Sequence, residues 1–118
     1  LNLEFSNSKY NNDPDIILGD LNGTSCSSFL INEVKAIFEK HNFFVTKNHP
    51  FSGGYITKQY GNPSDDIHVI QIEINKKLYM NENSIKKNKN FENLRTKLTA
   101  VIEELSNLYP TRKKIAAE

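Results

Sequence analysis

Residues 68–82 read HVIQIEINKKLYMNE, and the first half of this stretch predicts the strand around which the fold is organised. Its aliphatic residues are nearly continuous, which is typical of a central strand covered on both faces. Gln71 and Glu73 interrupt the run, and both point to the same face because side chains alternate along a strand. A buried carboxylate is costly unless it is paired, protonated or bound to a metal. We therefore expect Glu73 either to have a cationic partner or to face a cleft as an acid or base.

Size and composition predict one small domain. The chain has 118 residues, and we expect residues 1–118 to share one core. Because it begins at Leu1 without methionine, we expect it to be a piece of a longer protein. A net charge of +1 favours neither nucleic acid nor a membrane as a partner, and no apolar run reaches the roughly 18–20 residues that span a bilayer. The single Cys26 excludes an internal disulfide and fits a reducing compartment, which predicts a cytoplasmic protein.

Upstream of the quoted stretch, the pattern predicts a short buried strand and one helix. Residues 16–18 are apolar and are followed by Gly19-Asp20, which ends the strand. Leu30, Val34 and Phe38 recur at helical spacing, with serines before them for the cap and Lys40-His41-Asn42 at the end. The loop 21–28 leaves a helix N-terminus that can take an anion, but it lacks the spacing of a phosphate loop, so a capped helix is the preferred interpretation. The other segments expected here are a tail at 1–12, a turn at 13–15, a strand at 43–46, a glycine-containing loop at 48–55, a short edge strand at 56–57 and a turn at 60–66.

Downstream, the sequence becomes basic and then amphipathic. Residues 81–89 are rich in lysine and asparagine, which predicts a solvated linker. A long amphipathic helix follows from Phe91 to Leu108 and is expected to stop at Pro110. The tail 111–118 is expected to be poorly ordered, like 1–12.

Four blocks of this sequence, taken together, resemble the N-formylglutamate amidohydrolase (N-formylglutamate deformylase) family. They read LGDLNGTSC at 18–26, NHPFSGGY at 48–55, YGNP at 60–63 and QIEINKKLYM at 71–80. The likeness covers what corresponds to the carboxyl-terminal part of that family's protein. It implies an α/β fold with a mixed sheet flanked by helices, as in part of the zinc-carboxypeptidase-like (phosphorylase/hydrolase-like) fold. It also implies metal-dependent hydrolysis of the formyl or similar acyl amide of an N-acylated acidic amino acid, with a divalent metal, zinc, as cofactor.

Within that resemblance, Glu73 is the expected catalytic residue. It fits the role of a general base beside the attacking water by its residue type and its place on the strand. An N-acyl amino dicarboxylate carries two carboxylates and one amide, so its site needs cations and fixed hydrogen-bond donors. The residues expected to bind this substrate are Asn48, Gly53, Gly54, Tyr55, Asn75 and Lys76. The alternative for each is structural: a capping asparagine, a turn glycine or a packed tyrosine.

The sequence also departs from the family pattern. Leu21 stands where the family has an arginine, and Lys76 replaces another arginine, so a point charge takes the place of a bidentate fork. The metal-ligand segment that the family carries before the first turn would correspond to residues 3–6, with Phe5 in place of histidine. His41, His49 and His68 match no usual ligand spacing. No metal ligand is therefore assigned to this chain.

Three hypotheses follow. The chain is the carboxyl-terminal segment of an amidohydrolase, and its partners are the small-molecule N-acyl amino acid and an amino-terminal half. Alternatively, it is a truncated, non-catalytic remnant of that fold. In the third hypothesis it is an oligomerising interaction module, whose exposed sheet edge or long helix pairs with another chain.

Overall fold

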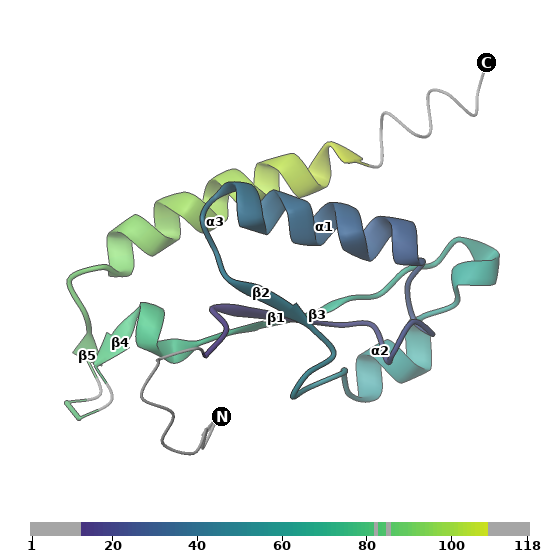
Figure 1. The fold of residues 1–118 in the computed structure, drawn as a ribbon, viewed down its shortest axis with the longest axis horizontal. Helices are drawn as coiled ribbons and strands as arrows, with labels where there is room; N and C mark the ends of the chain where they lie inside the picture. Colours follow the sequence, from purple (N-terminus) through teal and green to yellow (C-terminus); the bar gives the residue numbers. More distant parts are fainter. Residues whose placement is uncertain (1–12, 82, 85, 109–118) are drawn as a thin grey trace.

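The computed structural model of the chain describes residues 13–81, 83–84 and 86–108, and Figure 1 shows how they fold. The tails expected at residues 1–12 and 111–118 lie outside this range, and so does Pro110, where the last helix was expected to stop. The elements in chain order are β1 (Ile16–Gly19), α1 (Ser28–Lys40), β2 (Val45–Lys47), α2 (Tyr55–Tyr60), β3 (Gln71–Ile74), β4 (Met80–Asn81), β5 (Lys86–Lys87) and α3 (Phe91–Ser106). Short 3-10 turns lie at Pro63–Asp65 and Lys76–Leu78.

A mixed three-stranded sheet lies at the centre, in the order β2-β1-β3. β1 runs parallel to β2, with Ile16 opposite Val45, and antiparallel to β3, with Ile17 opposite Glu73. All four residues of β1 are buried because strands cover both of its edges and helices cover its faces. The expected α/β fold with a mixed sheet flanked by helices is therefore confirmed.

The prediction that the strand around residue 72 is central was wrong for the part of the chain that the structure describes. There, β3 forms an edge of the sheet, and the side chain of Ile72 is 41% exposed. The aliphatic run was misleading because the same run suits a central strand and an edge strand that lies beneath a helix. The centre of the sheet is the shorter run Ile16–Gly19.

Helix α1 confirms the predicted helix and its caps, but Ile31 takes the buried place that was expected for Leu30, which is only partly buried. The Ser27 side chain accepts a hydrogen bond from the Leu30 N–H and caps the helix. Asn42, just beyond the other end, has a positive φ of 66°, a conformation that asparagine tolerates better than most residues. Ile31, Val34 and Phe38 form the buried stripe that packs on the sheet.

Three local predictions were wrong. The second strand begins at Val45, not at Phe43, because Phe43 leaves the ladder to pack edge-on against Phe38 with ring centroids 5.8 Å apart. Residues 56–57 belong to helix α2 and not to an edge strand, since Gly54 and Thr57 bond to each other across its first turn. The basic stretch predicted to be a linker contains the hairpin β4–β5.

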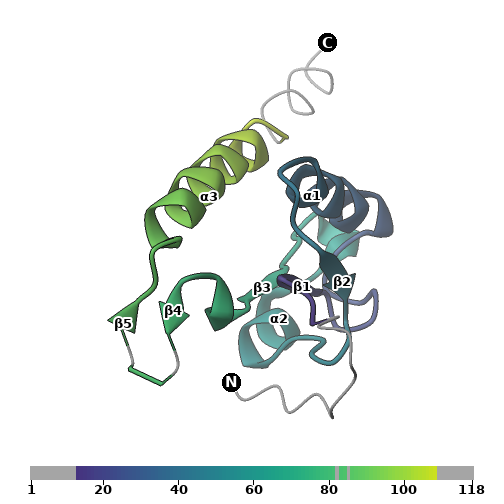
Figure 2. The same cartoon turned by 60° about the vertical axis from the view of Figure 1, so that its left-hand side comes forward.

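The helices lie on both sides of the sheet. Figures 1 and 2 show α1 and α3 side by side on one face and α2 on the opposite side. Leu94 and Val101 of α3 are buried against the core, which continues through Phe38 of α1 and Ile16 of β1. In the residues that the structure describes, no helix is both long and apolar enough to cross a membrane.

Candidate active site

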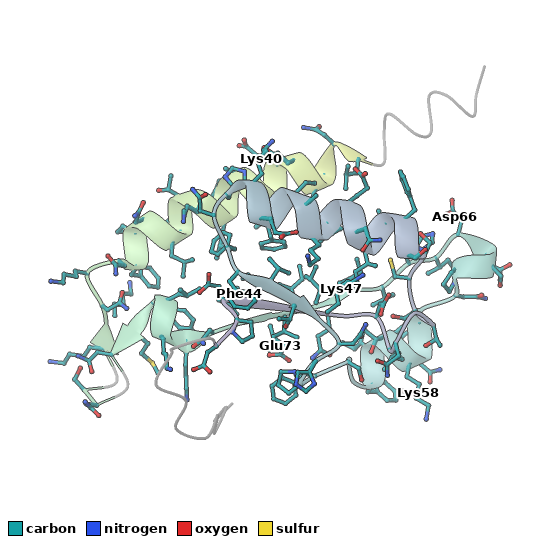
Figure 3. All side chains as sticks on the ribbon, viewed as in Figure 1. Lys40, Phe44, Lys47, Lys58, Asp66 and Glu73 are labelled. Carbon is teal, nitrogen blue, oxygen red and sulfur yellow. The ribbon has the colours of Figure 1, made fainter. Side chains whose placement is uncertain are left out.

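Glu73 lies on the face of β3 that points away from α1 and α3, towards the side where α2 sits (Figure 3). Its backbone is held by the ladder to Ile17, and its half-buried carboxylate accepts a hydrogen bond from the Gln71 amide two residues earlier. Across residues 13–81, 83–84 and 86–108, the ion pairs of the protein do not include Glu73. The sequence left two explanations for this carboxylate, a cationic partner or a role as an acid or base. A cationic partner is not found in the described chain.

The backbone of Gly54 approaches the side chain of Gln71, the hydrogen-bond partner of Glu73. A Cβ atom added at Gly54 would lie 3.5 Å from Oε1 of the Gln71 side chain. Gly53 has φ +129°, and a side chain there would come within 2.5 Å of the Thr57 hydroxyl. Glycine is therefore required at position 53 both for its backbone conformation and for space.

Thr57 fixes that loop and was not singled out from the sequence. Its hydroxyl accepts a hydrogen bond from the Gly54 N–H at 2.9 Å and donates one to the Gly54 carbonyl at 2.8 Å. The side chain is almost fully buried. Thr57 is the third residue of α2 and its side chain bonds back to the N-cap N–H, as in a capping box, but with glycine at the N-cap the usual sequence signature of that motif is missing.

Hydrogen bonds between Asn48 and Asp20 hold the loop that follows β1. The side-chain Oδ1 of Asn48 accepts hydrogen bonds from the N–H groups of Asp20 and Asn22, at 3.0 and 3.2 Å, and its side-chain Nδ2 donates to Asp20 Oδ1 at 2.7 Å. The same Asp20 oxygen accepts from the Gly23 N–H, which makes the buried Asp20 the centre of the loop. Sequence reasoning did not identify this role of Asp20.

The other predicted binding residues surround this area without forming one cluster. Tyr55 begins α2, and its side chain is 72% exposed. Asn75 lies beyond the carboxyl end of β3, where it accepts a hydrogen bond from the Lys77 N–H and donates to the Pro14 carbonyl. Lys76 follows it in a 3-10 turn. The structure thus brings Gly54 close to Gln71, the partner of Glu73, and gives Asn75 capping bonds.

The histidines have other partners. His68 Nδ1 accepts the Ser27 N–H at 3.0 Å, so the proton is on Nε2, which contacts Asp66 at 2.8 Å. This link joins the loop before β3 to the start of α1. His41 contacts Glu104 at 3.3 Å. No three His, Cys, Asp or Glu side chains within the described residues are grouped so as to hold a metal ion, so this part of the chain does not fit a zinc site.

The mixed sheet between helices defines the class of this protein as an α/β fold. The structure is similar to that of N-formylglutamate amidohydrolase from Ralstonia eutropha JMP134, with a TM-score of 0.75 and 29% sequence identity. That similarity covers 84% of this chain and 36% of the Ralstonia chain.

The chain belongs to the N-formylglutamate amidohydrolase family, whose sequence profile matches residues 3–80. Over 70 residues it is 37% identical to the N-formylglutamate deformylase of Pseudomonas putida and 34% identical to that of Pseudomonas aeruginosa. The matched region is 58% of this chain and 26% of each relative. The chain thus spans about a quarter of the length of the curated relatives it matches.

Proposed function

We propose that this chain forms part of a hydrolase that removes the formyl group from an N-formylated acidic amino acid, and that Glu73 is its general base. Family membership supports the reaction class, and the names of the Pseudomonas relatives support N-formylglutamate as the substrate. The observation that carries the proposal is the setting of Glu73, a half-buried carboxylate that is bonded to Gln71, the residue that Gly54 approaches, and that has no cationic partner in the described chain.

The proposed reaction needs one proton acceptor. A water molecule attacks the formyl carbon while Glu73 takes one of its protons, and the carbon–nitrogen bond then breaks. Glu73 delivers the proton to the leaving nitrogen, so that formate and the free amino acid are the products. The hydrogen bond from Gln71 orients the carboxylate, and the pairing with Ile17 fixes the backbone position of Glu73 in the sheet.

The substrate contacts belong to the same proposal. Tyr55 and Lys76 offer a phenol and an ammonium group for the two carboxylates of the substrate. Gly53 precedes Gly54, whose backbone lies close to the Gln71 side chain that bonds to Glu73, and we propose that the backbone of Gly53 contacts the substrate. Asn48, Gly54 and Asn75 make bonds within the protein, so we propose that their main contribution is to shape the wall of the site.

A divalent metal, zinc, and a zinc-carboxypeptidase-like arrangement of the complete fold are further expectations of this proposal. Because the described residues do not form a ligand set, we assign no ligand to them and derive no step through a metal. A cytoplasmic location is proposed from the single, buried Cys26, which fits a reducing compartment. The alternative, a remnant without catalytic activity, is the other outcome of the following test.

The test grafts residues 3–80 into the corresponding region of the Pseudomonas putida deformylase and measures release of formate from N-formyl-L-glutamate. We expect the graft to be active and Glu73→Gln to lower its rate by about 10²–10⁴-fold, the usual contribution of a general base. Glu33→Gln, at an exposed position on α1, is the matched control and should leave the rate unchanged. An active graft in which Glu73→Gln has no effect would contradict the role of Glu73. A folded but inactive graft would favour the remnant.

A further inference from the structure

One edge of β3 offers backbone groups that no strand of the described chain uses. The N–H groups of Val69 and Asn75 point to the β1 side, where they donate to the carbonyls of Ser25, in the loop after β1, and Asp15, just before β1, at 2.8 and 2.9 Å. Backbone groups alternate in direction along an antiparallel strand, so those of Ile70, Ile72 and Ile74 point away from β1. Each of these three residues offers one donor and one acceptor at the open edge.

Helix α3 covers the space beside that edge. Figure 2 shows α3 on the side of β3 that faces away from β1 and β2. Two apolar grooves lie between the strand and the helix. One, of about 320 Å³, has Ile70 and Ile72 on the strand side and Leu105 on the helix side. The other, of about 410 Å³, lies between Ile74 and the α3 residues Leu98 and Ile102.

The edge and the grooves together have the shape of a slot for one extended strand. We define the β3–α3 slot by the six residues Ile70, Ile72, Ile74, Leu98, Ile102 and Leu105. A strand in it would bond to the open backbone groups, and every second side chain would enter the grooves under α3. Branched aliphatic residues suit the grooves, and polar ones suit the opposite side, next to Gln71 and Glu73.

We propose that the β3–α3 slot binds a β-strand from the part of the amidohydrolase fold that the matched region does not contain. The similarity to the Ralstonia enzyme leaves most of that chain unmatched, so the family fold includes ample polypeptide for this role. The inference concerns assembly and goes beyond the proposed hydrolysis, because a chain without catalytic activity would have the same slot.

A second copy of this chain fits the slot less well. Two-fold antiparallel pairing through β3 would leave both α3 helices on the same face of the joined sheet. Neighbouring strands lie about 4.8 Å apart, whereas packed helices need about 8–10 Å. Because each α3 already covers the space beside its own β3, the two helices would collide. A strand that brings no such helix avoids this conflict.

The test co-expresses the full chain, carrying an affinity tag, with the Pseudomonas putida deformylase from which the 70 matched residues have been deleted. We expect the two polypeptides to co-purify in a one-to-one complex by light scattering. Amide hydrogen exchange should slow at Ile70, Ile72 and Ile74 in that complex. In the chain alone, these amides should exchange faster than those of Gln71 and Glu73, which face β1.

Two variants make the result specific. Ile72→Lys puts a charge at the slot and should lower recovery of the co-expressed polypeptide by about tenfold or more. Phe29→Lys changes a residue that is 66% exposed on α1, away from the slot, and should leave recovery unchanged. Equal recovery with Ile72→Lys, or no complex at all, would overturn the proposal. A dimer of the chain alone that protects the same amides would also overturn it, in favour of the second copy.

Discussion

At the scale of single residues, a few polar side chains hold the loops beside Glu73. Asp20 and Asn48 join loops that are 28 residues apart in the chain, and Thr57 fixes the glycine pair. Each of them is buried or half-buried with its hydrogen bonds satisfied, as buried polar groups must be to avoid a large desolvation cost. The unusual position of Glu73 could be predicted from the sequence because a carboxylate in an aliphatic run is conspicuous. The bond between Asp20 and Asn48 could not, since the two residues are distant in the chain.

Cys26 gives a prediction at this scale. Burial and, to a smaller extent, the nearby Asp20 carboxylate raise the pKa of its thiol to about 11, so little reactive thiolate forms at neutral pH. We expect the folded chain to react with a thiol reagent at pH 8 far more slowly than the unfolded chain in guanidinium chloride, as measured by absorbance. The chain has one cysteine, so the signal is unambiguous. Equal rates in the two states would show that Cys26 is accessible.

At the scale of elements, charged groups join the end of α1 to the last turns of α3. Lys40 and His41 both contact the Glu104 carboxylate, at 2.7 and 3.3 Å. A cation at the carboxyl end of α1 is also favourable for the helix dipole. Both helices could be predicted from their apolar stripes, and α1 also from its caps. This contact could not, because helical periodicity does not say which helices are neighbours.

The contact predicts a pH dependence. The hydrogen bond from Lys40 lowers the pKa of Glu104, so the stabilisation is present above the pKa of the unfolded chain and is lost as the pH falls through the folded value. We expect Glu104→Gln to lower the melting temperature slightly at pH 6 and to have a smaller effect at pH 3, as measured by circular dichroism. Glu92→Gln, in an exposed pair with Arg95, is the control and should have no effect at either pH. An equal effect of Glu104→Gln at both pH values would contradict the prediction.

At the scale of the whole molecule, one core joins the sheet to the two long helices. It runs from Ile16 and Val45 in the sheet through Phe38 of α1 to Val101 of α3. Because α3 contributes side chains to this core, it should unfold together with the sheet and not as a separate unit.

Val101→Ala tests that coupling. The side chain is fully buried, so we expect its truncation to lower the free energy of unfolding by about 1–3 kcal/mol. The midpoint should move equally when unfolding is followed by circular dichroism, which reports the helices, and by the Ile16 methyl resonance, which reports the sheet. Ile102→Ala, at a position that is 63% exposed on the same helix, should cost much less. A shift in the helical signal alone would mean that α3 is only loosely attached.

The sequence by itself determined the elements whose signals are local: the apolar run of β1, the capped helix α1 and the amphipathic helix α3. It also determined the family, because the four blocks keep their order and spacing, and it singled out Glu73. Only the tertiary structure decided the order β2-β1-β3, the helix at 55–60 and the approach of Gly54 to Gln71. Propensity and capping act over a few residues, whereas strand order and the neighbours of a side chain depend on contacts between distant parts of the chain.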